Sequence, residues 1–79
     1  MKVSVLIDSI NKVKDFVKIT SESKVENIDI KSGRHVVDAK SIMGLFSLNL
    51  SDPVELTIEH DDDIEVENLL NDLSAFIVK

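Results

Sequence analysis

The segment at 54–59 constrains the fold more than any other part of the chain. Its sequence, VELTIE, alternates Val, Leu and Ile with Glu, Thr and Glu. Successive side chains of a β-strand point to opposite faces of a sheet, so this strand has one apolar face and one polar face. A sheet with one face in water is characteristic of antiparallel pairing. The segment therefore predicts an antiparallel sheet that is covered on one side only.

Periodic patterns in the rest of the chain predict the other elements. Alternation indicates strands, and apolar residues at every third or fourth position indicate helices. Gly33 suits a tight hairpin turn, and Pro53 blocks the continuation of any helix before it. In chain order we expect a strand at 3–8, a helix at 10–20, strands at 27–31 and 34–39, a short helix after Ser41, the strand at 54–59 and a final helix up to about residue 77.

This order, β-α-β-β-α-β-α, predicts an α+β fold with a four-stranded antiparallel sheet and helices packed on one face. The chain has 79 residues, which suits a single domain (1–79) with a small core. Because 43% of the residues are hydrophobic, a packed core is expected and disorder is not. No internal repeat, low-complexity tract or linker interrupts the pattern.

Composition excludes several classes of function. The formal net charge of −6 and the absence of Tyr and Trp argue against nucleic-acid binding, which needs clustered basic and stacking side chains. Without cysteine there is no disulfide or thiolate metal site. No apolar run approaches membrane-spanning length, and the first residues do not form a signal peptide. We therefore expect a cytoplasmic domain without membrane insertion.

The uncharged run at 41–51 stands out in a chain whose residues are 30% charged. Ser41 is well placed to cap a short helix, and a phosphate on it would meet free backbone N–H groups there. Three apolar side chains fall on one side of that helix, while others could face the sheet. The first group is Ile42, Met43 and Phe46; the second is Leu45, Leu48 and Leu50. Sequence alone leaves open whether the first group packs in the core or docks a partner.

This run is where the chain resembles a known family. The sequence AKSIMGLFSLNL, followed by a turn, the strand VELTIEH and a final helix with an acidic start, resembles HPr, the histidine-containing phosphocarrier of the bacterial sugar phosphotransferase system. The similarity is strongest over 28–76 and implies an open-faced β-sandwich. It also implies protein partners: phosphotransferase-system proteins, an HPr kinase or a catabolite-control regulator. Ser41 matches a serine that a dedicated kinase phosphorylates in some HPr proteins, and Ile42, Met43 and Phe46 resemble HPr's partner-docking patch.

The first strand–helix junction departs from the family. HPr carries Gly-(Leu/Ile)-His-(Ala/Thr)-Arg-Pro there, and its histidine accepts the phosphoryl group. This chain reads IDSINKVKDF, with Ser9 or Ile10 opposite the histidine. Neither side chain can form a phosphoimidazole. The sequence therefore predicts that phosphohistidine chemistry is absent at this junction.

Two main hypotheses follow. In the first, the chain is a non-catalytic interaction or regulatory module that docks through Ile42, Met43 and Phe46, with Ser41 as a candidate phosphorylation switch. In the second, it is a working phosphocarrier with an unconventional acceptor such as His35. A third hypothesis is a domain that only folds and pairs, as a subunit or as the remnant of a fused domain. None of the three requires a cofactor.

Simpler structural roles compete at each of these positions. Ser9 and Ser41 suit plain helix caps, and Ser9 has no identifiable base that would activate it as a nucleophile. The two histidines suit the surface, and the run at 61–63 suits the start of the final helix better than a metal site. The basic side chains of the first helix form either a solvated face or a surface for an acidic partner. The histidines are His35 and His60, the acidic run is Asp61, Asp62 and Asp63, and the basic side chains are Lys12, Lys14 and Lys18.

Overall fold

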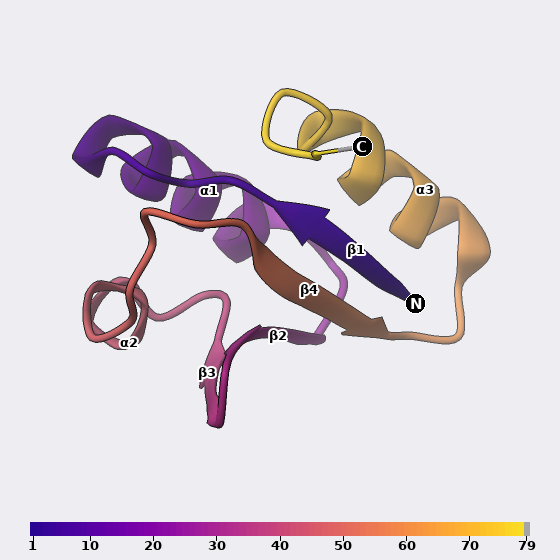
Figure 1. Ribbon diagram of the computed structural model, residues 1–79. Coiled ribbons are helices and arrows are strands. Elements are labelled where there is room, and N and C mark those ends of the chain that lie inside the picture. Colours follow the sequence, from indigo (N-terminus) through magenta and orange to yellow (C-terminus); the bar gives the residue numbers. More distant parts are fainter. Residues whose placement is uncertain (79) are drawn as a thin grey trace.

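The computed structural model describes residues 1–78 and contains four strands and three helices (Figure 1). Their order along the chain is the one expected from the sequence. The elements are β1 (Lys2–Val5), α1 (Ile10–Glu22), β2 (Asn27–Ser32), β3 (His35–Asp38), α2 (Ile42–Phe46), β4 (Val54–Glu59) and α3 (Asp63–Asp72).

The strands form a single antiparallel sheet in the order β1-β4-β2-β3. β4 lies inside the sheet, with Leu56 opposite Val3 on one side and Ile30 on the other. Its Val, Leu and Ile side chains are buried, while its Glu and Thr side chains are half-buried or exposed. The one-sided sheet predicted from the VELTIE segment is therefore confirmed.

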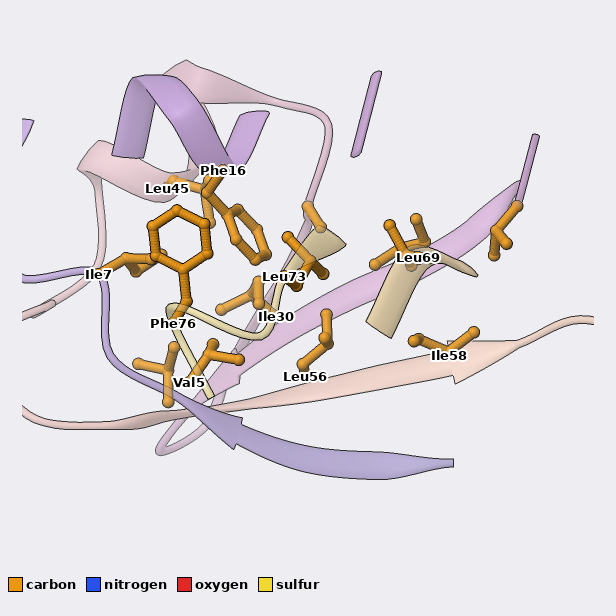
Figure 2. Packing of buried hydrophobic residues seen from close by; sticks show 14 of the residues in the cluster. Val5, Ile7, Phe16, Ile30, Leu45, Leu56, Ile58, Leu69, Leu73 and Phe76 are labelled. Atoms are coloured by element: carbon orange, nitrogen blue, oxygen red, sulfur yellow. The ribbon is translucent and has the colours of Figure 1, made fainter. Parts of the chain in front are cut away.

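The helices α1 and α3 lie on the same side of this sheet and cover its apolar face, while α2 lies beside the edge strand β3 (Figure 1). Phe16 of α1 packs edge-on against Phe76, with ring centroids 5.9 Å apart and an interplanar angle of 87°. Figure 2 shows these two rings with Ile7 and Leu45 at one end of the core. Each large apolar side chain buried in this way contributes about 1.5–3 kcal/mol to folding.

Two glycines permit tight local geometry. Gly33 has φ 60° at the first position of the two-residue turn between Ser32 and His35, where a side chain would be strained. Gly44 lies where α2 approaches β3, and a Cβ there would be 3.3 Å from the Cβ of Val37. Glycine therefore lets α2 pack closely against the edge strand.

The helix α1 begins at Ile10, as expected, and extends two residues further than expected, to Glu22. It buries Val13, Phe16 and Thr20. Ile10 was expected on this apolar stripe, but its side chain is 63% exposed because it lies at the first turn, beyond the edge of the core.

The two ends of the chain differ from the sequence prediction. β1 stops at Val5 instead of Asp8, and α3 stops at Asp72 although helical spacing continues to Ile77. The chain leaves α3 because its last residues pair with the free edge of β1. Leu6 N donates to Phe76 O (2.8 Å), Val78 N donates to Ser4 O (2.9 Å), and Val5 and Ile77 form a β-bridge. This C-terminal segment, Phe76–Val78, covers one edge of the sheet.

Candidate functional site

The start of α1 and the region of α2 meet at a shallow hollow of about 220 Å³. Its lining comes from the β1–α1 junction, α1, α2 and the loop after α2. The lining residues are Ile7, Asp8, Ser9, Ile10, Val13, Phe46, Leu48 and Leu50. Both regions selected from the sequence, the junction around Ser9 and the apolar run after Ser41, therefore contribute to one surface.

At the junction, Ser9 acts as the N-cap of α1. Its Oγ accepts a hydrogen bond from Lys12 N (3.2 Å), and its carbonyl accepts one from Val13 N (3.0 Å). Capping satisfies backbone N–H groups that have no partner within the helix. The expected structural role of Ser9 is confirmed.

Asp8 and Lys12 form an ion pair at the same junction. Asp8 Oδ1 lies 3.0 Å from Lys12 Nζ, across one turn of helix. The hydrogen bond and the charge of Lys12 lower the pKa of Asp8, so that this exposed carboxylate is ionised at neutral pH. The sequence suggested Asp8 only as a helix cap beside Ser9 and not as a residue of the site, although its spacing of four residues from Lys12 is a recognisable signal for such a pair.

Ser41 caps α2 as predicted. Its Oγ accepts a hydrogen bond from Gly44 N (3.2 Å), and its own N–H donates to Asp38 O (3.0 Å). The side chain of Ser41 is exposed. The hydroxyl therefore faces solvent, while it also fixes the first turn of a five-residue helix.

The structure resolves which way the apolar residues of α2 point. Met43 is 78% exposed and Phe46 is 46% exposed, whereas Ile42 is half-buried. Leu45 is completely buried in the core beside Phe16 (Figure 2). Met43 and Phe46 therefore form an exposed apolar surface, which Ile42 borders.

Neither histidine lies at the start of α1. His35 is exposed at the beginning of β3, the strand at the opposite edge of the sheet from β1. His60 follows β4, and its Nε2 lies 2.6 Å from Glu65 Oε2. No imidazole lines the hollow among the residues that the structure describes.

The acidic run after His60 starts α3. Asp62 is its N-cap and accepts hydrogen bonds from Ile64 N (3.0 Å) and Glu65 N (3.2 Å). This is the role expected from the charge pattern. Within residues 1–78, no three His, Asp or Glu side chains are arranged to hold a metal ion. In the same range, no helix has the length and apolar character needed to cross a bilayer.

Comparisons with known proteins relate this geometry to a family. Residues 11–79 match a family profile described as the PTS HPr component phosphorylation site. The chain is also similar to the crystal structure of HPr-C-His from Thermoanaerobacter tengcongensis, with a TM-score of 0.74 and 25% sequence identity over 95% of this chain and 92% of that chain. A comparison with curated proteins returned no match. The profile match begins at Asn11, immediately after Asp8, Ser9 and Ile10.

Proposed function

The chain belongs to the HPr family of phosphotransferase-system phosphocarriers, and we propose that within this family it acts by docking protein partners without carrying a phosphohistidine. The observation that carries this proposal is the chemistry of the β1–α1 junction. Asp8, Ser9 and Ile10 occupy the junction, and within residues 1–78 no imidazole lines the adjacent hollow. A phosphoryl group cannot be held on a ring nitrogen that is not present.

The exposed apolar surface of α2 supports the docking part of the proposal. Met43 and Phe46 are exposed side by side with the half-buried Ile42, in a segment that has no charged residue between positions 41 and 51. Leaving such a surface in water costs free energy, and burial against a partner recovers it. The partner surface is therefore Ile42, Met43 and Phe46.

Ser41 supplies a means of regulating that surface. Its hydroxyl is exposed and directly precedes Ile42 and Met43 in the chain. A phosphate would add a charge of about −1.5 to −2 beside the apolar surface. We therefore assign Ser41 as the regulatory phosphorylation site, whose modification selects between partners.

The absence of phosphohistidine is tested by incubating the chain with phosphoenolpyruvate and Enzyme I, with an ordinary HPr as a positive control. The expected result is an acid-labile phosphate on HPr and none on this chain. Acid-labile label on this chain would overturn the proposal. If a His35→Ala variant then lost the label, His35 would be the unconventional acceptor.

The switch is tested by incubation with an HPr kinase and ATP. Label is expected on the unmodified chain and absent from a Ser41→Ala variant. Ser47→Ala is a matched control, because Ser47 lies at the other end of α2, where its Oγ donates to Gly44 O. Equal labelling of Ser41→Ala and the unmodified chain, or no labelling of either, would remove Ser41 as the site.

A further inference from the structure

The hollow extends the docking surface from α2 to α1. Phe46 belongs to both, because it is exposed on α2 and also lines the hollow. On the opposite wall, Ile10 is 63% exposed at the first turn of α1. The hollow is thus an apolar depression lined by two exposed apolar side chains, Ile10 and Phe46, and it suits an inserted side chain.

Among residues 1–78, Asp8 is the single charged side chain in the lining. This carboxylate is ionised at neutral pH, as an ordinary aspartate is, and Lys12 lowers its pKa further. A carboxylate offers about four lone-pair sites, and the bond to Lys12 Nζ uses one of them. Asp8 is therefore able to accept a further hydrogen bond from a cation placed at the rim.

The wider charge distribution favours the same kind of partner. The chain carries a formal net charge of −6, which attracts basic proteins and repels acidic ones at low salt. The α2 side of the hollow, 41–51, has no cationic side chain that would oppose this attraction. Of the three lysines on α1 considered for an acidic partner, Lys12 is engaged with Asp8.

We infer that the hollow receives one apolar side chain of a basic partner segment, and that an arginine or lysine next to this side chain binds Asp8. This inference rests on the proposed docking function and specifies the chemistry of the partner. The apolar insertion supplies most of the binding free energy, while the contact with Asp8 selects the sign of the partner's charge.

The test uses amide chemical shifts of the full, isotope-labelled chain at low salt. Three small probes share a phenethyl group and differ in charge: phenethylguanidinium, phenylpropionate and phenethyl alcohol. We expect shifts confined to 7–10 and 46–50. The cation should bind about two- to fivefold more tightly than the anion, the range of an exposed ion pair.

Two variants separate a local contact from general charge. Asp8→Asn should abolish the preference for the cation. Asp15→Asn, which makes the same change in net charge on an exposed carboxylate outside the hollow, should preserve it. Lys12→Gln should increase the preference, because it releases Asp8 from its present partner.

The inference is overturned if the three probes bind equally, if the anion binds best, or if Asp15→Asn has the same effect as Asp8→Asn. Shifts outside the hollow would also overturn it. So would changes at 7–10 and 46–50 with protein concentration alone, because the occupant would then be a second copy of the chain. The result does not depend on phosphorylation, so failure of the Enzyme I or kinase assays remains a separate outcome.

Discussion

Thr20 is a polar side chain in the middle of an apolar core. It is completely buried, and its hydroxyl lies 3.1 Å from the carbonyl oxygens of Ala39 and Val17. Through Ala39, it ties α1 to the loop that precedes α2. A single hydroxyl thereby helps to fix the position of the docking surface relative to the first helix.

Thr20→Val keeps the shape of this side chain and removes its hydrogen bond. Because the Ala39 carbonyl would lose its hydroxyl donor inside the core, we expect the free energy of unfolding to fall by about 1–3 kcal/mol. Urea unfolding measures the change. Thr57→Val, on the polar face of the sheet, serves as a control with a small effect. Equal stability of Thr20→Val and the unmodified chain would contradict the role assigned to this hydroxyl.

Asp8 makes stability depend on pH in a defined direction. Its pKa is lowered in the folded chain, so the pair with Lys12 stabilises the fold above the ordinary aspartate pKa of about 3.9 and is lost as the pH falls through the folded value. Asp8→Asn should therefore be less stable than the unmodified chain at neutral pH and equally stable in strong acid. Thermal unfolding across this range measures the difference, and a difference that persists in strong acid would exclude the ion pair as its cause.

At the scale of elements, the caps fix where the helices begin. Ser9→Ala removes the side-chain acceptor for Lys12 N and should lower the free energy of unfolding by about 1 kcal/mol. Ser21→Ala, at an exposed position inside α1, should instead be neutral or slightly stabilising, because alanine favours helix. Chemical denaturation distinguishes the two variants. Similar effects of both would show that capping does not determine the start of α1.

The sequence predicted an element correctly where the type and start of that element are determined by residues close to each other in the chain. Alternation identified β4, and capping residues placed the starts of α1 and α2. Helical spacing placed Leu45 and Met43 on different sides of α2, but it did not determine which side faces the core. The end of α3 did not, because Phe76 keeps that spacing although its backbone pairs with β1, an edge that lies far away in the sequence.

The candidate site was partly predictable for the same reason. Ser9 and Ser41 were identified because helix capping is local. The hollow was not, since it joins Ile7 to Leu50, and only the folded chain brings these residues together. Asp8 was not assigned to the site, because a surface ion pair becomes informative only when it is known to border an apolar depression.

At the scale of the whole molecule, the C-terminal segment Phe76–Val78 both fills the core and covers a sheet edge. A chain that ends at Ala75 should lose about 3–5 kcal/mol of stability, the usual effect of removing a buried phenylalanine. It should also self-associate at high concentration, because the exposed edge of β1 can pair with another chain. Sedimentation measures the association.

Phe76→Ala is the control for this truncation. It removes the ring that packs against Phe16 but keeps the backbone bonds to β1. We expect a similar loss of stability with little self-association. If the truncated chain stayed monomeric, or if Phe76→Ala associated as strongly, covering of the edge would not be the function of this segment.

The sheet order also dictates when the molecule can fold during its synthesis. β1 emerges from the ribosome about fifty residues before β4, its only strand partner in the described sheet. The other edge of β1 pairs with Phe76–Val78, which emerges later still. The nascent chain therefore holds an unpaired strand until both of these segments have been synthesised.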